Sequence, residues 1–317
     1  MKTKHQPAFA ALRHDRQYLI AATLALTCAL ASSTTQAQSI SAFDGHLTLA
    51  PADATSSGSG GVGDDVKDEQ AELAKKLNNP VADLISVPIE NNWDFGIGPA
   101  DAMKYTAKIQ PVIPVHITEN WNLILRTILP VIYQEALDNN PLAPASVRES
   151  HSGLGDTEQS FFFSPKNPVG GWILGAGPVG YYPTATENAL GAGKWGAGPT
   201  VLALRQEHGW TYGILANQIW SFAGQQDRQN INSSFIQPFV VYTTKTYTSF
   251  EVNSESTYDW QANQATVPLN FQVQQLVKIC GHPVAFKVGY RYYVNKPDGG
   301  PDWGLRFAIT FLFPEKH

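Results

Sequence analysis

Charged residues, cysteines and long hydrophobic runs are all scarce in this sequence of 317 residues. Charged side chains make up 15% of it, whereas soluble globular proteins average about a quarter. The formal net charge is −5. Proteins that bind nucleic acid usually present a strongly basic face, so this balance argues against a nucleic-acid partner.

The sequence has two cysteines, Cys28 and Cys280. Cys28 lies inside an apolar segment that we interpret as an export signal, so the mature chain would keep Cys280 alone. A single thiol cannot form an internal disulfide, and it cannot build a cysteine-based zinc site. We therefore expect no metal and no cofactor, and a structural role for Cys280.

The N-terminus has the features of a secretory signal peptide. A basic region is followed by an apolar segment, Tyr18 to Ala31, and by small residues around Ala37. The apolar segment is shorter than the ~20 residues of a membrane-spanning helix, which predicts cleavage after Ala37. The basic region holds Lys2, Lys4, Arg13 and Arg16. We predict a signal peptide over 1–37, a flexible periplasmic segment with a short helix (Val66 to Asn79) over 38–79, and one domain over 80–317.

No run of 18 apolar residues occurs after residue 80, which excludes a membrane-spanning helix there. What recurs is alternation of apolar and polar residues with period two, in segments of about ten residues. In "WGLRFAITFLF" (303–313), every second residue is large and apolar, and Arg306 lies on the opposite face. The segments 104–117, 250–260, 267–274 and 284–295 alternate in the same way. This pattern predicts β-strands with one apolar face.

A soluble β-sandwich also alternates, with its apolar face inward, but three features favour a membrane barrel. The strands keep alternating for about ten residues, which suits a tilted membrane crossing better than a globular strand. Aromatic residues gather near the strand ends, and connections alternate between short and long, as in outer-membrane barrels. We therefore predict an all-β, transmembrane, antiparallel up-and-down β-barrel of about twelve strands. These begin near residues 82, 104, 121, 154, 169, 195, 210, 231, 246, 266, 283 and 303.

Six prolines inside predicted strands conflict with this fold, because each removes one backbone donor from the ladder. They are Pro88, Pro111, Pro114, Pro130, Pro238 and Pro268. The segment "WNLILRTILPVIY" (121–133) shows both the strength and the weakness of the prediction. As a strand it places Arg126 in the barrel interior between two interface aromatics, but its pattern gives no reason for Pro130.

Charged residues on the predicted inward face are the candidates for contact with a solute. The candidates are Lys104, Lys108, His116, Arg126, Lys287, Arg291 and Arg306, with the acidic Glu251, Glu255 and Asp259. Two interpretations stay open. The bases could form one wall of an open lumen, with a field across it that a polar solute would feel. Alternatively, the charges could pair with one another and fill a narrow barrel.

One sequence feature could indicate catalysis, since His151 precedes Ser152. Neighbouring residues on a strand point to opposite sides, and no third member of a catalytic triad is evident. We therefore predict that the chain is not an enzyme.

Four segments resemble bacterial outer-membrane proteins grouped with the phenol meta-cleavage-pathway family, some of which carry a neuromedin-U-like label. These segments are "NPVADLISVPIENNWDF" (79–95), "GLGDTEQSFFFSP" (153–165), "GAGPTVLAL" (196–204) and "GPDWGLRFAITFLFP" (300–314). The resemblance implies a β-barrel channel or transporter in the outer membrane of a Gram-negative bacterium. It implies small solutes, among them hydrophobic or aromatic carboxylates, and no catalytic residues.

Two other functions stay open beside the channel. The barrel could be an enzyme that acts on lipids, or a closed structural barrel without a pore. The partners expected of the protein are outer-membrane lipid and lipopolysaccharide, the barrel-assembly machinery during insertion, and a small-molecule solute.

Overall fold

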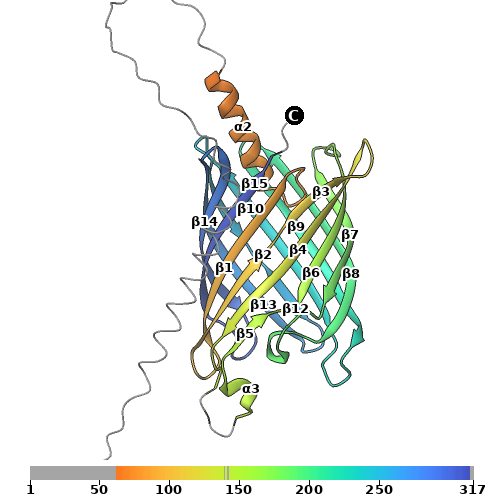
Figure 1. Cartoon of the computed structure of the whole chain (residues 1–317), viewed down its shortest axis with the longest axis vertical. Helices are drawn as coiled ribbons and strands as arrows, with labels where there is room; N and C mark the ends of the chain where they lie inside the picture. The colour runs from red at the N-terminus through yellow and green to blue at the C-terminus, as the bar shows by residue number, and fades with distance from the viewer. Residues whose placement is uncertain (1–61, 139, 141–142, 315–317) are drawn as a thin grey trace, which may run out of the picture. The chain divides into compact units, whose positions relative to one another are not determined.

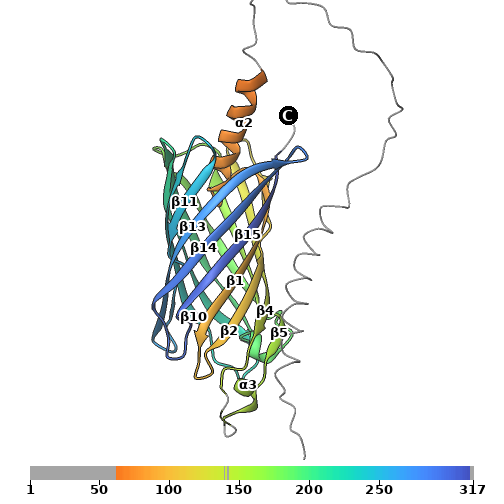
Figure 2. The same cartoon turned by 90° about the vertical axis from the view of Figure 1, so that its left-hand side faces the viewer.

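The computed structural model describes residues 62–138, 140 and 143–314, and the predicted signal peptide lies outside these residues. The described chain forms a closed antiparallel β-barrel in which the last strand pairs with the first (Figures 1 and 2). Within these residues, no helix is both long and apolar enough to cross a membrane. The predicted all-β barrel of twelve crossings is confirmed.

The elements in chain order are α2 (Val62–Leu77), β1 (Ile85–Ile97), β2 (Ala102–Ile109), β3 (Val112–His116), β4 (Trp121–Gln134), α3 (Ala145–Arg148), β5 (His151–Leu154), β6 (Thr157–Pro165), β7 (Ile173–Tyr182), η2 (Asn188–Leu190), β8 (Lys194–Glu207), β9 (Trp210–Gly224), β10 (Asn232–Thr243), β11 (Thr248–Asn253), β12 (Ser256–Asp259), β13 (Gln264–Ile279), β14 (His282–Asn295) and β15 (Trp303–Phe313). Three pairs, β2 with β3, β5 with β6 and β11 with β12, are each one interrupted crossing. We call the end of the barrel where β1 begins and β15 ends the terminus end, and the opposite end the loop end.

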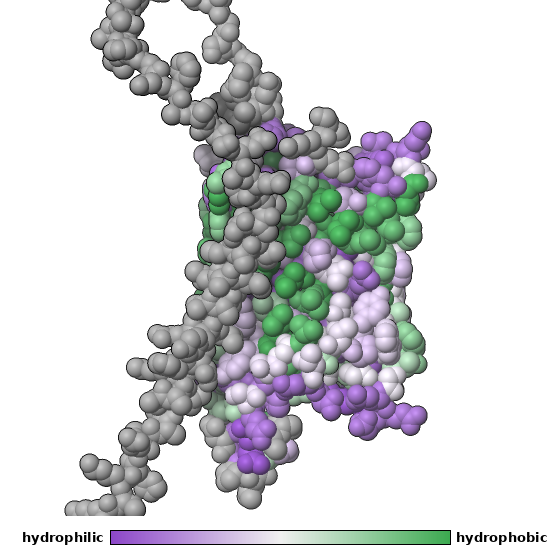
Figure 3. All heavy atoms as spheres, in the orientation of Figure 1, coloured by the Kyte–Doolittle hydropathy of each residue, from purple (hydrophilic) through white to green (hydrophobic). Residues whose placement is uncertain are grey.

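The outer wall of the barrel is apolar between two polar ends. Figure 3 shows hydrophobic residues on the wall and hydrophilic residues at both ends. Exposed tryptophans lie near both ends: Trp121 and Trp210 begin β4 and β9 at the terminus end, while Trp195 and Trp303 lie at the loop end. Aromatic girdles around an apolar band are the usual surface of an outer-membrane barrel.

Strand β4 has the register that its alternation predicts. Trp121 and Val131 are exposed on the outer face, whereas Asn122, Ile124 and Ile132 are buried. Arg126 shares the inward parity and donates a hydrogen bond from Nη2 to Gln110 Oε1 at 2.9 Å. The arginine therefore lies inside the barrel, as the sequence predicts.

Four of the six prolines, Pro88, Pro130, Pro238 and Pro268, face the three interruptions of the ladder. Pro111 lies within one interruption, and Pro114 pairs with Ile124 inside β3. The N–H and C=O of one strand residue point to the same neighbouring strand, so the partner of each proline carbonyl shows where the missing N–H would point. Pro130 accepts a hydrogen bond from the N–H of Gly155 at 2.9 Å, and Gly155 lies between β5 and β6. The N–H that Pro130 lacks would therefore point at a β-bulge. Between Leu154 and Glu158 the chain has one residue more than regular pairing with β4 requires.

The same arrangement recurs at the other two interruptions. Pro88 accepts from the N–H of Gln110 at 2.9 Å, between β2 and β3. Ser254, between β11 and β12, donates its N–H to Pro238 at 3.1 Å and its hydroxyl to Pro268 at 2.6 Å. Bulges and breaks leave ladder positions unpaired, so these prolines remove few bonds that the barrel would otherwise form.

Candidate functional site

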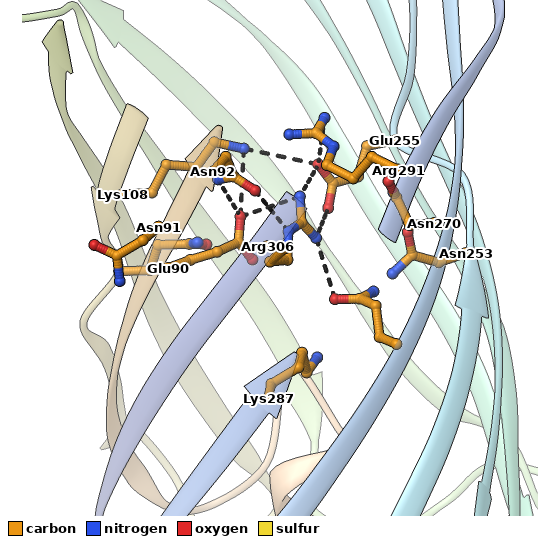
Figure 4. A network of polar contacts seen from close by, with 12 residues as sticks. Glu90, Asn91, Asn92, Lys108, Asn253, Glu255, Asn270, Lys287, Arg291 and Arg306 are labelled. Atoms are coloured by element: carbon orange, nitrogen blue, oxygen red, sulfur yellow. Dashed lines mark hydrogen bonds and ion pairs between the residues drawn. The ribbon is translucent and has the colours of Figure 1, made fainter. Parts of the chain in front are cut away.

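The middle of the barrel interior holds a network of charged side chains centred on Arg306 of β15 (Figure 4). The Arg306 side chain is 2% exposed. Its Nη1 and Nη2 lie 2.7 and 3.0 Å from the two carboxylate oxygens of Glu255, and Nη2 lies 3.2 Å from Glu90. Its Nε donates to Asn92 Oδ1 at 2.7 Å. A buried charge needs partners of this kind to avoid a large desolvation cost.

Two local features of the sequence bring Arg306 and Glu255 together although their strands are not neighbours. Glu255 lies at the interruption between β11 and β12 and continues the inward face of Glu251 and Asn253. Gly289 of β14 pairs with Arg306 on one side and with Gln272 of β13 on the other. Because Gly289 has no side chain, the guanidinium extends across β14 and reaches within 3.4 Å of Gln272 Oε1.

Replacing Gly289 with valine should disturb this crossing. An added Cβ would lie 2.8 Å from Gln272 Cγ and 3.2 Å from the Phe271 carbonyl oxygen, so side chains must move. We expect the free energy of unfolding to fall by about 1–3 kcal/mol, the usual cost of overpacking. Urea titration in detergent micelles measures it, with Ala203→Val on the outer face of β8 as the control. Equal stability of the two variants would contradict the assigned role of Gly289.

Three further bases join the same network. Lys108 lies 3.8 Å from Glu90 and 3.7 Å from Glu255. Arg291 lies 3.5 Å from Asp94 and 3.9 Å from Glu255, and Lys287 lies 2.7 Å from Glu251. The members are Lys108, Lys287, Arg291 and Arg306 against Glu90, Asp94, Glu251 and Glu255. In this part of the interior the bases are neutralised by an equal number of acids, which is the pairing that the second interpretation describes.

The acidic partners on β1 are missing from the candidates that the sequence predicted. Glu90, Asn92 and Asp94 all point into the barrel, where they contact Arg306, Lys108 and Arg291. The sequence does indicate that these residues point inward, because alternate positions of "ISVPIENNWDF" (85–95) are large and apolar. One polar residue on the outward face, Asn91, interrupts that pattern.

The other predicted residues lie apart from the network. Lys104 shares a register position with Asp94, but it forms no ion pair within 4.0 Å with another described residue. His116 Nε2 lies 2.9 Å from Asp83 near the terminus end. Asp259 accepts hydrogen bonds from the N–H groups of Gln261 and Ala262 at 2.8 and 3.2 Å, so it stabilises a turn. Whether any of the predicted residues contacts a solute stays a prediction.

The opposite side of the interior contains an apolar cluster beside polar residues such as Asn122, Thr200 and Asn217. Inward side chains of β3, β4, β6, β8, β9 and β10 form one buried cluster with Val81, which precedes β1. The cluster contains Val81, Val112, Ile124, Phe162, Leu202, Leu204, Leu215, Phe239 and Val241. The interior therefore has a charged network on one side and an apolar cluster on the other.

Residues Leu73–Leu84, which we call the plug segment, close the terminus end of the barrel. Leu73, Ala74, Ala82 and Leu84 pack against the inward side chains of Leu276, Ala285 and Leu312. Figures 1 and 2 show α2 meeting the barrel at this end.

Polar contacts hold the plug segment to several strands. Asn78 Nδ2 donates to Thr243 Oγ1 and Ser249 Oγ at 3.1 and 3.2 Å, and Gln206 Nε2 donates to the Lys75 carbonyl at 2.9 Å. The short "NPVADL" (79–84) shows no periodicity, so sequence patterns give no signal for this insertion.

Below the plug segment the interior contains a partly open cavity of about 180 Å³. Its walls include Arg126, Gln110 and Glu90 on the polar side and Leu215 and Phe239 on the apolar side. A cavity of this size holds roughly six waters at their volume in the liquid, or one small organic solute.

The His151 and Ser152 side chains point to opposite faces of β5. Ser152 pairs with Tyr133 of β4 and His151 pairs with Gln134, so the serine faces outward and the histidine inward. His151 Nδ1 lies 2.8 Å from Glu187 Oε2. The two residues therefore do not form a nucleophile and base pair. Among the described residues, no group of three or more His, Cys, Asp or Glu is placed to hold a metal ion.

No protein-family model matches the chain, and no curated protein matches it in sequence. Among solved structures, it is similar to the COG4313 outer membrane channel from Pseudomonas putida F1, with a TM-score of 0.57 and 14% identity over 73% of this chain and 95% of that chain. It is also similar to the NanC porin (TM-score 0.45, 11% identity, 71% and 98% covered) and to an outer membrane phospholipase of Salmonella typhi (0.42, 10%, 75% and 96%). The first likeness confirms an outer-membrane barrel fold. Membership of the phenol meta-cleavage-pathway family stays a prediction.

The prediction that the chain is not an enzyme needs correction. An outer membrane phospholipase is among the solved barrels named above. The sequence argument rested on one Ser-His pair, and the failure of one pair cannot exclude every other arrangement of catalytic groups.

Proposed function

We propose that this protein is an outer-membrane channel for small solutes. The observation that carries the proposal is the interior of the closed barrel, which is lined on one side by charged side chains and contains a cavity. A barrel that served only as a structural element would need no buried charges, which are costly to place in a protein interior. The likeness to a channel from Pseudomonas putida F1 supports the same function.

The solutes that we propose are small hydrophobic or aromatic carboxylates. Arg126 lies outside the neutralised network and lines the cavity, so it supplies a basic group that attracts an anion, and the cluster around Phe162 and Leu215 supplies an apolar wall. A solute with an apolar body and a carboxylate would contact both sides at once. Outer-membrane location, export by the signal peptide and insertion by the barrel-assembly machinery belong to the same proposal.

Planar-bilayer recording of the purified mature chain tests the channel. We expect discrete steps of small conductance, because the plug segment fills one end of the barrel. Swelling of liposomes in the presence of benzoate or a neutral sugar gives a second measure of passage. Absence of conductance and of swelling would favour the closed structural barrel, and release of fatty acid from phospholipid vesicles would favour the lipid enzyme.

A further inference from the structure

The cavity below the plug segment is lined by an arginine that has no carboxylate partner among the described residues, unlike Arg306 in the charged network. Arg126 lines this cavity, and its recorded hydrogen bond is the one from Nη2 to Gln110 Oε1. No carboxylate lies within 4.0 Å of it among the described residues. Arg306, by contrast, has carboxylate partners at 2.7, 3.0 and 3.2 Å. Arg126 is therefore a guanidinium with unused donors beside a space.

The acidic residues around the same space are already paired. Glu90 lines the cavity and lies 3.2 Å from Arg306 and 3.8 Å from Lys108. Glu251 also lines it and lies 2.7 Å from Lys287. Glu158, one inward position from Arg126 toward the loop end, accepts a hydrogen bond from Asn217 Nδ2 at 3.2 Å. Of the other lining bases, Lys287 is paired with Glu251 and Lys76 is exposed to solvent, so Arg126 is the base inside the barrel best able to accept a new anionic partner.

The wall opposite these charges is apolar and buried. Leu215 is 2% exposed, Val241 3% and Phe239 7%, and all three line the cavity. An apolar group placed there would replace contact with water by contact with hydrocarbon, which is favourable in proportion to the area covered.

We propose that this cavity is a binding site for one small carboxylate with an apolar body, and that Arg126 holds the carboxylate. A guanidinium donates two parallel N–H bonds to a carboxylate, which gives a charge-assisted and oriented contact. The ring or chain of the solute lies against Leu215 and Phe239. The plug segment forms one wall of the site, since Asn78, Asn79 and Ala82 also line it.

The size of the cavity limits the solute. At about 180 Å³ it is smaller than the ~300–1,000 Å³ of common ligand pockets. A single ring with one carboxylate fits a space of this size. The site deepens the proposed function and depends on it for its biological role, but its occupancy can be measured without any transport.

Isothermal titration calorimetry of the folded mature chain in detergent micelles tests the site with benzoate. Benzamide keeps the ring but lacks the charge, and acetate has the charge but lacks the ring. We expect benzoate to bind at least about tenfold more tightly than either, since charge-assisted hydrogen bonds contribute about this much. Equal affinity for benzoate and benzamide, or no heat of binding for benzoate, would overturn the proposal without any variant.

Variants then locate the site. Arg126→Gln should weaken benzoate binding about tenfold or more, while Arg205→Gln, which removes an exposed pair with Glu207 on the outer face, should leave it unchanged. Leu215→Asn should weaken benzoate binding more than acetate binding. Unchanged benzoate affinity in Arg126→Gln would place the bound anion elsewhere. Conductance recorded on the same preparations separates the two ideas: conductance without benzoate binding refutes the site alone, and binding without conductance refutes the channel alone.

Discussion

Replacing Glu255 with glutamine should lower the free energy of unfolding by about 3–5 kcal/mol, the usual cost of leaving one member of a buried ion pair without its partner. Arg306 would lose its two shortest ionic contacts, at 2.7 and 3.0 Å, while its side chain stays 2% exposed. Glu90 alone cannot replace them, because it also partners Lys108. Urea titration of the folded barrel in phospholipid vesicles measures the change.

The matched control for this variant is Glu69→Gln. Glu69 pairs with Lys278 at 2.8 Å, but its side chain is 53% exposed, and exposed pairs contribute about 0–1 kcal/mol. The double variant Glu255→Gln with Arg306→Met removes both buried charges, and we expect it to be more stable than Glu255→Gln alone. If Glu255→Gln destabilises the barrel no more than Glu69→Gln does, the network is not a buried ionic structure.

Expelling the plug segment should raise single-channel conductance several-fold, because the segment fills one end of the barrel. Val81→Asp combined with Leu84→Asp places charges among apolar side chains, where they are costly to bury. Both residues are buried in the structure, at 5% and 4% exposed. The barrel itself should stay closed, since β1 pairs with β15 over 85–95 without help from these residues. Planar-bilayer recording gives the conductance.

Glu72→Gln is the control for the plug variants. Its side chain is 63% exposed and pairs with Lys75 of the same helix, so its loss leaves the packing of the plug segment intact. We expect wild-type conductance for this variant. If the double aspartate variant also conducts like the wild type while remaining folded, the segment does not limit passage.

The inward and outward faces of the barrel could be predicted from the sequence, because a membrane wall imposes strict alternation. "WGLRFAITFLF" and "WNLILRTILPVIY" placed Arg306 and Arg126 in the interior, where the structure has them. Alternation predicts which face of the wall a side chain occupies, but it does not predict which side chains meet across the interior. The pairing of Arg306 with Glu255 depends on Gly289, which only the three-dimensional register places beside Arg306.

The plug segment and the acidic residues of β1 were harder to predict for two different reasons. The plug segment is short and aperiodic, and its burial depends on side chains far away in sequence, such as Leu276 and Leu312. Glu90 and Asp94 follow the alternation, but Asn91 on the outward face obscures it. The apolar cluster opposite the network departs from the simple rule that a barrel interior is polar, because its side chains pack against one another and against Val81 of the plug segment.

The prolines that face the ladder breaks also have a consequence for how the barrel finds its strand pairing. Alternation excludes a slip of one residue, since that would turn every side chain to the wrong face. A slip of two residues keeps every face correct, and alternation cannot exclude it. Such a slip would move Pro130 away from Gly155 and place it opposite a residue whose backbone carbonyl needs a donor. Proline has no N–H to donate, and lipid cannot replace it. At the strand pairs that contain them, the prolines thus penalise the even shifts that the pattern of faces allows.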